Sequence, residues 1–362
     1  MTHRLATDEC TEVSVIVPNF NHGQHLTRSI EALASQDCPP GEIIVIDDAS
    51  TDDSVVIVER LATRFPSIRL FRNPDNLGVT RTVLKGIAAS SGRYLAFAAA
   101  DDWVMPGFFS LAVAMLERYP QAGLFCGDMA LIDGVSGRRL GLRPAVVPRF
   151  TPGYVSPAQM RQKLVYGDYQ IVTGGALFRR DAFVEAGGLD EELGSFSDGF
   201  LACKIALTRG FCYAPEVVAT WRLLPTGLSR DTALNLDKAR RMLEVAHRKL
   251  ASDPAFPNWY PDQFSKRWRF ATSRLVLNER RIDFNFVTAM SARNGFDRAV
   301  LGAIAVMSKG SFGRLAALSW LWFRLRPYRL RDLVSTWVFR CIPFRSPAIK
   351  PALENGNAML SL

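Results

Sequence analysis

The chain has 362 residues, of which 48% are hydrophobic and 22% are charged. This composition excludes disorder over most of its length and allows a sizeable buried core. The net charge is +9, and nine Lys and Arg against two Asp and Glu lie between residues 301 and 362. Most of the excess positive charge therefore belongs to the C-terminal tail and says nothing about the rest of the chain.

The N-terminus and the cysteines indicate where the protein resides. Residues 1–11 are polar and lack the apolar stretch of a signal peptide. No run of 18 or more apolar residues occurs in the sequence, so no transmembrane helix is expected. The six cysteines are scattered without a Cys-x-x-Cys pair, which is typical of unpaired thiols in a reducing compartment. These features predict a cytoplasmic protein.

Short apolar strands alternate with helical segments over the first hundred residues. Residues 13–17 form a β-branched run that stops at Pro18, and residues 24–36 then carry apolar side chains at helical spacing. The alternation continues with strands at 42–46, 68–71 and 94–98 and helices at 55–65 and 80–90. This order predicts βαβ units, a mostly parallel central sheet and hence an α/β fold.

Polar residues follow three of these strands: Pro18-Asn19, Asp47-Asp48 and Asp101-Asp102. Ligands of such sheets bind at the carboxyl ends of the strands, so we expect these residues to line one site. Asp47 and Asp48 could accept hydrogen bonds from a ribose hydroxyl or a base N–H. The alternative is that this pair serves turn and capping chemistry together with Ser50 and Thr51.

The pair Asp101-Asp102 suits a divalent cation. Mg²⁺ or Mn²⁺ can bridge a carboxylate and the two phosphates of a diphosphate, and can then stabilise the departing group as a Lewis acid. The alternative is that one of the two acids caps the following helix while the other is solvated.

Several segments resemble the family 2 glycosyltransferases. They are VSVIVPNFN (13–21), IIVIDDASTDDS (43–54), NLG (76–78) and GRYLAF (92–97), the last preceding Asp101-Asp102. Their order and spacing are similar to the family over residues 13–230. The resemblance implies an inverting enzyme with the GT-A fold, which binds a nucleotide-sugar donor.

The resemblance also implies a role for each matching position. Pro18 and its neighbour Asn19 would line the nucleotide pocket, and Asp48 would bind the base, uracil in many members, with Asp47 beside it. Asp101 and Asp102 would be the metal-binding end of the DxD-type motif, and Asp101 would also contact the donor.

Residues 187–191 (GGLDE) are similar to the GGFDE turn of the family. Ser197-Asp198 then falls where the family has a Glu-Asp pair, so Asp198 is the implied general base. Inverting transfer needs one base to take the proton of the acceptor hydroxyl. The alternative role for Asp198 is to cap the helix that begins here.

We expect an N-terminal tail (1–12) and a GT-A domain (13–230), with a nucleotide-binding part (13–128) and an acceptor-side part (129–230). A helical basic region (231–345) and a flexible tail (346–362) would follow. Helices are expected at 232–251, 262–279, 285–307 and 312–323.

The Trp and Arg residues of the helical region indicate contact with an anionic membrane surface, which would place the protein at the inner face of the cell membrane. A helical cap with a solvated basic face is the alternative reading. No nucleic-acid recognition module surrounds these charges, so a nucleic-acid partner is not expected.

The sequence thus predicts metal-dependent transfer, with Mn²⁺ or Mg²⁺, of a sugar from a nucleoside-diphosphate sugar, first of all a UDP-sugar. The acceptor would be a saccharide or lipid-linked saccharide in polysaccharide or glycolipid assembly. Ala99, Ser197 and Leu224 stand where the family often has Asp, Glu and His, which motivates a second hypothesis, an inactive nucleotide-binding scaffold. A dinucleotide oxidoreductase is disfavoured because no GxGxxG follows the first strand.

Overall fold

The computed structural model describes residues 10–341 except 166, 168–170, 225–226 and 308–310. The expected tail at 346–362 and most of the expected tail at 1–12 lie outside the described residues. The first elements are β1 (Val13–Asn19), α2 (Gly23–Ala34), β2 (Glu42–Asp47), α3 (Ser54–Arg64), β3 (Ile68–Arg72), α4 (Val79–Ala89) and β4 (Tyr94–Phe97).

These first four strands are all parallel, in the spatial order β3-β2-β1-β4. β1 and β2 read as continuous apolar runs because helices cover both faces of the sheet, and their side chains are almost all buried. The register pairs Asn19 with Asp47, the last residues of β1 and β2. The two polar residues predicted to share a site are therefore neighbours at one edge of the sheet.

The second half of the sheet is mixed. Its elements are α5 (Phe108–Arg118), β5 (Leu124–Asp133), β6 (Arg139–Arg143), β7 (Gly153–Val155), α6 (Pro157–Leu164), η1 (Thr173–Gly175), β8 (Ala176–Arg179), α7 (Arg180–Glu185), η2 (Glu191–Phe196), α8 (Ser197–Thr208) and β9 (Phe211–Leu223). β8 lies antiparallel between β4 and β5, β9 is parallel to β5, and β6 and β7 add antiparallel edges. The α/β fold class is confirmed, while parallel pairing dominates only its first four strands.

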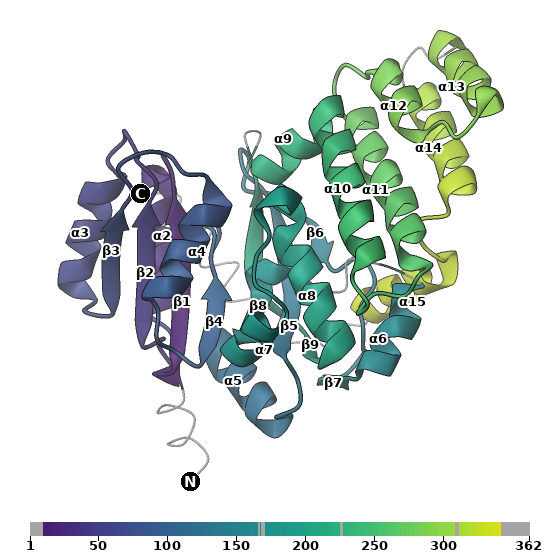
Figure 1. Cartoon of the computed structure of the whole chain (residues 1–362). Helices are drawn as coiled ribbons and strands as arrows, with labels where there is room; N and C mark the ends of the chain where they lie inside the picture. Colours follow the sequence, from purple (N-terminus) through teal and green to yellow (C-terminus); the bar gives the residue numbers. More distant parts are fainter. Residues whose placement is uncertain (1–9, 166, 168–170, 225–226, 308–310, 342–362) are drawn as a thin grey trace.

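The sheet has a hydrophobic core on each face. One face packs against α2, α3 and α5, and the other packs against α4 and α8. The second core continues beyond the sheet, because Phe264 and Met290 of the C-terminal helices belong to it. The helical region is thus joined to the α8 side of the sheet by shared apolar packing (Figure 1).

The C-terminal region consists of α9 (Leu228–Leu234), α10 (Leu236–Ser252), α11 (Tyr260–Leu277), α12 (Phe284–Ser291), α13 (Gly295–Met307), α14 (Ser311–Leu325) and α15 (Leu330–Cys341). The single helix expected at 285–307 is interrupted after Ser291, where Ala292 adopts an extended conformation. None of the described helices is both long enough and apolar enough to cross a membrane.

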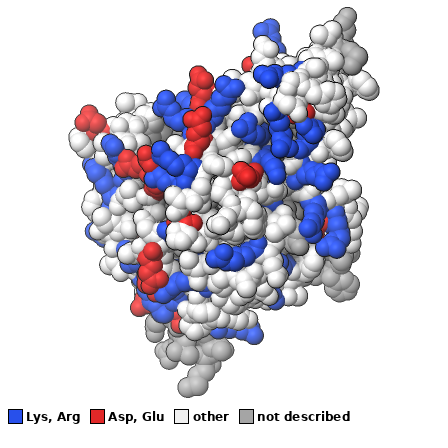
Figure 2. All heavy atoms as spheres, turned by 45° about the vertical axis from the view of Figure 1, so that its right-hand side comes forward, with Lys and Arg blue, Asp and Glu red and all other residues white. Residues whose placement is uncertain are grey.

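Positive charge is distributed over the whole helical region and not only its end. Residues 231–362 hold 22 Lys and Arg against 10 Asp and Glu, whereas residues 1–230 hold 22 against 25. Residues 1–230 thus carry a slight net negative charge, and the excess positive charge already begins at α10. Figure 2 shows many of these cations over the side of the molecule formed by the C-terminal helices.

The cysteines correct one expectation. Cys10 and Cys38 form a disulfide bond that connects the segment before β1 to the loop before β2. The expectation that all six cysteines are unpaired thiols is therefore wrong for this pair, and their number no longer argues for a reducing compartment. Sequence spacing gave no signal because the two residues are 28 positions apart and come together only when β1 and β2 pair.

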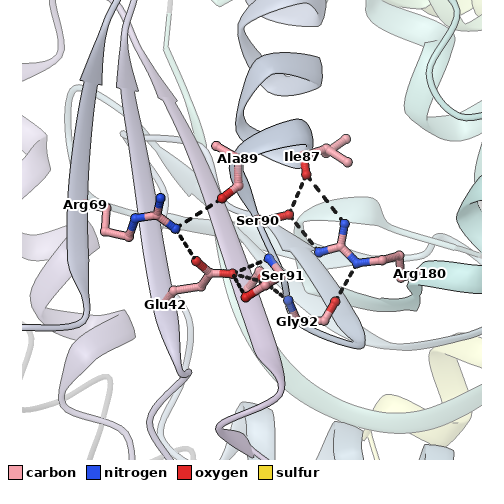
Figure 3. Close-up of polar contacts among 9 residues, drawn as sticks. Glu42, Arg69, Ile87, Ala89, Ser90, Ser91, Gly92 and Arg180 are labelled. Atoms are coloured by element: carbon pink, nitrogen blue, oxygen red, sulfur yellow. Dashed lines mark hydrogen bonds and ion pairs between the residues drawn. The ribbon is translucent and has the colours of Figure 1, made fainter.

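A polar cluster closes the amino-terminal edge of the sheet, at the opposite end from the Asn19–Asp47 pair (Figure 3). The Glu42 carboxylate accepts hydrogen bonds from Ser14 Oγ at 2.7 Å and from Ser91 N at 2.6 Å, and it pairs with Arg69 at 2.7 Å. Arg180 donates to Gly92 O at 2.6 Å from the other side of the 90–92 turn. The cluster fixes the turn that leads into β4.

Burial alone would raise the pKa of Glu42, but the hydrogen bonds from Ser91, Ser14 and Arg69 outweigh it and hold the pKa below its usual value. Because the folded pKa is depressed, this group stabilises the fold above the unfolded pKa, and the contribution is lost as the pH falls through the folded pKa.

We therefore expect Glu42→Gln to lower the free energy of unfolding by about 2 kcal/mol at pH 7. The difference from wild type should shrink below about pH 4. Urea unfolding at both pH values measures this, with the exposed Glu59→Gln as control. A difference that stays constant with pH would contradict the assignment.

Candidate functional site

An open pocket lies at the carboxyl-terminal edge of β2 and β3. Its volume is about 430 Å³. The residues that line it are Asp47, Ala49, Ser50, Arg72, Asn73 and Pro74. Ligands of α/β sheets bind at this edge, and the size suits a base with its ribose.

One hydrogen-bond network builds the floor of this pocket. Asn19 Nδ2 donates to Asp47 Oδ1 at 2.9 Å and to Ser50 Oγ at 3.1 Å. Asp47 Oδ2 accepts from Ser50 N at 3.0 Å. Between them Ala49 has a φ of 62°, a left-handed conformation that non-glycine residues adopt rarely and mostly at functional sites. Pro18, one residue earlier, pairs with Ile46 and orients the end of β1.

Asp48 binds the 73–78 loop, which carries two of the pocket residues. Its Oδ1 accepts from Asn73 Nδ2 at 2.7 Å and from Leu77 N at 2.9 Å, and its Oδ2 accepts from Gly78 N at 2.9 Å. Burial opposes the charged form, but these donors keep the pKa of Asp48 below its usual value. Both oxygens are thus occupied by the 73–78 loop, and Asp47, not Asp48, lines the pocket.

The acid pair follows β4 and is held in place by the end of β9. Asp102 Oδ1 accepts from the backbone N of Arg222 at 2.6 Å. Burial, and next the neighbouring Asp101, raise the pKa of Asp102 well above its usual value, although Arg222 opposes the shift. The following helix, α5, has Gly107 at its N-cap and no side-chain cap, so neither acid caps it. Asp102 itself is half-buried.

The donor set for a cation at this point is small. Among the described residues, no group of three or more His, Cys, Asp and Glu side chains could hold a metal ion. Two carboxylates nevertheless suffice for Mg²⁺ or Mn²⁺ when substrate phosphates complete the shell. Asp101 and Asp102 therefore fit a cation that arrives with its diphosphate.

A cluster that the sequence did not reveal lies beside the acid pair, and we call it the Arg222 cluster. Its members are His25, Arg28, Trp103 and Arg222. Arg222 Nη1 lies 2.9 Å from His25 Nδ1, and the guanidinium carbons of Arg28 and Arg222 lie 3.5 and 5.4 Å from the centre of the Trp103 ring. Arginine cannot accept a hydrogen bond, so His25 Nδ1 must be the acceptor and His25 is neutral. Burial, and next Arg222, lower the pKa of His25 accordingly.

This Arg222 cluster places two cations beside two carboxylates. His25 and Arg222 are 197 positions apart in the sequence, and only the fold brings them together. The sequence feature that could have indicated a role for Arg222 is its position at the end of an apolar strand, two residues before Leu224.

Asp198 lies in the first turn of α8. Its Oδ2 accepts a short hydrogen bond from Thr173 Oγ1, and its Oδ1 accepts from Gly199 N at 2.7 Å. Burial raises the pKa of Asp198 despite these hydrogen bonds, which makes the carboxylate a stronger base. The neighbouring Ser197 has a structural role, because its Oγ accepts from Asp190 N at 2.7 Å and ties the 187–191 turn to α8.

The predicted site residues fall into three groups. The pocket group contains Asn19 and Asp47, the acid pair contains Asp101 and Asp102, and Asp198 stands apart with Thr173. The short helix η1, which carries Thr173, contacts β4 and α8 and so lies between the acid pair and Asp198.

The fold agrees with solved glycosyltransferases. S. aureus TarS 1-349 in complex with UDP-GlcNAc superposes with a TM-score of 0.55 at 15% identity, over 85% of this chain and 88% of that one. The mannosyltransferase PcManGT from Pyrobaculum calidifontis, in complex with GDP-Man and Mn²⁺, gives 0.55 at 19% identity, over 92% and 88%. The protein thus has the predicted GT-A fold, extended by a helical region.

Sequence relatives lead to the same family. Residues 14–187 match the family model described as glycosyl transferase family 2. The uncharacterized glycosyltransferase YibD of Escherichia coli is 36% identical over 29% of this chain and 30% of its own length, and the putative glycosyltransferase EpsE of Bacillus subtilis is 29% identical over 52% and 68%. This part of the chain belongs to glycosyl transferase family 2. For three of the curated relatives, the match spans between 30% and 66% of the relative's own length.

Proposed function

We propose that the protein transfers a sugar, with inversion, from a nucleoside-diphosphate sugar to a hydroxyl acceptor. The observation that carries the proposal is the pocket at the β2–β3 edge, which has Asp47 in its wall. The Asp101-Asp102 pair follows β4, which lies on the other side of β1 from β2. A UDP-sugar is the first candidate donor, as the family resemblance implies.

In the proposed reaction the acceptor oxygen forms a bond to the anomeric carbon while the bond from that carbon to the diphosphate oxygen breaks. Asp198 takes the proton of the acceptor hydroxyl as this bond forms. Asn19 and Asp47 orient the nucleotide, and Asp48 keeps the 73–78 loop in place. Asp101 and Asp102 would hold Mg²⁺ or Mn²⁺, which supplies charge stabilisation to the departing diphosphate.

Arg222 and Arg28 extend this arrangement. Their guanidinium groups stack on Trp103 next to the acid pair, where they reduce the repulsion between two carboxylates and an anionic donor. Arginine cannot bind a metal ion, so this cluster does not replace the acid and the histidine that Ala99 and Leu224 leave out as ligands. We propose that it adds positive charge beside a cation that fewer protein groups hold.

The acceptor in this proposal is a saccharide or lipid-linked saccharide, in polysaccharide or glycolipid assembly at the inner face of the cell membrane. The proposed division places the GT-A domain at 13–230, where the net charge is close to neutral, and the basic helical region at 231–345. This division follows the change from mixed sheet to helices after β9.

A second candidate is a nucleotide-binding scaffold without transferase activity. The small donor set around Asp101 and Asp102 favours it. Binding and turnover separate the two candidates, because a scaffold would bind a nucleoside diphosphate and yet remain silent in transfer and donor-hydrolysis assays with Mn²⁺ and with Mg²⁺.

A thermal-shift series with UDP, GDP and ADP, each with Mn²⁺ or with EDTA, tests donor binding. At a ligand concentration of 100 times Kd we expect about 2.7 kcal/mol of stabilisation for one nucleotide class. Asp47→Asn should reduce the shift, and the exposed Asp53→Asn, which does not line the pocket, should not. If no nucleoside diphosphate shifts the wild-type protein, the proposal fails.

A further inference from the structure

The last described helix, α15, presents two different faces. Its inner face contacts the catalytic sheet and its connecting loops. Thr336 is buried and its Oγ1 accepts from Val147 N at 3.3 Å, and the Phe339 ring lies 4.7 Å from that of Phe150. These contacts fix which side of the helix points outward.

A buried ion pair locks this orientation. Arg340 Nη2 lies 2.9 Å from Asp128 Oδ2 and also donates to Pro144 O at 2.9 Å. Asp128 belongs to β5 and is buried, and Tyr213 of β9 donates to its other oxygen. α15 is therefore attached to the two strands at the centre of the second half of the sheet and cannot turn about its axis without breaking this pair.

The outer face of α15 is apolar and exposed. Leu330 is 68% exposed, Val334 49%, Trp337 66% and Val338 47%. Their spacing of four, three and one residues places them in one stripe along the helix. Large apolar side chains that cluster on a surface mark an interaction site, whereas scattered ones need no explanation.

The charges around this stripe are positive. Arg329 and Arg331 are exposed at the start of the helix, next to Leu330. Asp332 is the single acid between residues 301 and 341. A Trp-containing apolar stripe flanked by arginines matches the boundary between the headgroups and the acyl chains of an anionic bilayer, and it would repel a second cationic copy of the same face.

We propose that the outer face of α15 binds an anionic lipid bilayer, with Trp337 and Leu330 at the headgroup boundary and Arg329 and Arg331 on the phosphates. Through the Arg340–Asp128 pair the membrane would hold the GT-A domain in one orientation. The use of this contact, to present the site to a lipid-linked acceptor, rests on the proposed function. Binding to lipid does not depend on it.

Co-sedimentation of the full-length protein with vesicles tests the inference. Vesicles of phosphatidylcholine with 30% phosphatidylglycerol are compared with pure phosphatidylcholine, at about 0.1 M and 0.5 M salt. We expect binding to the anionic vesicles alone, weakened by salt, and reduced about tenfold by Trp337→Asp. Val184→Asp is the matched control, since Val184 is 65% exposed on α7 and should leave binding unchanged.

A charge variant and a donor-binding measurement complete the design. Arg331→Glu should weaken binding at low salt by about tenfold and have little effect at high salt. Both α15 variants should keep the wild-type melting temperature and nucleotide binding, which separates this inference from the proposed function. Equal vesicle binding by Trp337→Asp and wild type would overturn it. So would lipid-free self-association that Trp337→Asp abolishes, because the stripe would then join two copies.

Discussion

Replacement of Asp198 by asparagine should reduce the rate of sugar transfer by about 10²- to 10⁴-fold, the typical contribution of a general base. Asparagine keeps the size of the side chain and can still accept from Gly199 N, but it cannot take a proton from the acceptor. The measurement is kcat at saturating donor, and the affinity for nucleoside diphosphate should remain that of wild type. A variant that binds donor and transfers at the wild-type rate would remove Asp198 from the mechanism.

The acid limb of the pH profile provides an independent check on this residue. Asp198 must be unprotonated to act, and burial raises its pKa. Activity should therefore fall with decreasing pH at a higher pH than for a free aspartate, whose pKa is about 3.9. Thr173→Val removes the donor that opposes the shift, so it should move the acid limb further toward neutral pH.

Asp101→Asn is expected to have the second largest effect. Asp101 is one of the two acids of the proposed cation site, and no third potential ligand joins them among the described residues. Its removal leaves Asp102, whose Oδ1 already accepts from Arg222 N. The apparent affinity for the nucleotide in the presence of metal should fall at least about tenfold, and the thermal stabilisation by the nucleotide should fall with it. Thermal shift with UDP and Mn²⁺, repeated with EDTA, measures it.

The matched control is Asp75→Asn, an exposed acid on the loop after β3. Asp101 is preferred to Asp102 for this test because loss of Asp102 would also leave the end of β9 without its acceptor. If Asp101→Asn and wild type gain the same stability from the nucleotide with Mn²⁺, and EDTA changes neither, the acid pair does not hold a cation.

Part of this molecule could be predicted because the signals were local. The runs at 13–17 and 42–46 are β-branched and buried, and the structure has strands there with nearly the same bounds. The polar residues that follow them then had to meet, since parallel strands end at one edge. Asn19 and Asp47 are indeed hydrogen-bonded at 2.9 Å.

What the sequence could not predict depends on contacts between distant segments. Arg222 reaches His25 and Asp102 because β9 runs beside β5 and past the loop after β4, where Ala219 bridges Val104. The antiparallel insertion of β8 between β4 and β5 likewise has no local signature. Helical periodicity located α10, α11 and α14, but it gave no separate helix at 330–341. It also could not tell which apolar stripe would be buried and which, as in α15, would stay exposed.

The uneven charge of the two halves has a consequence for how the protein approaches a surface. Residues 1–230 carry a net charge of −3 and residues 231–362 carry +12, so the centre of positive charge is displaced from the centre of mass and the molecule has a permanent dipole. In the field of an anionic surface such a dipole experiences a torque before any contact is made. The helical half would therefore turn toward the surface during diffusion, before the outer face of α15 makes contact.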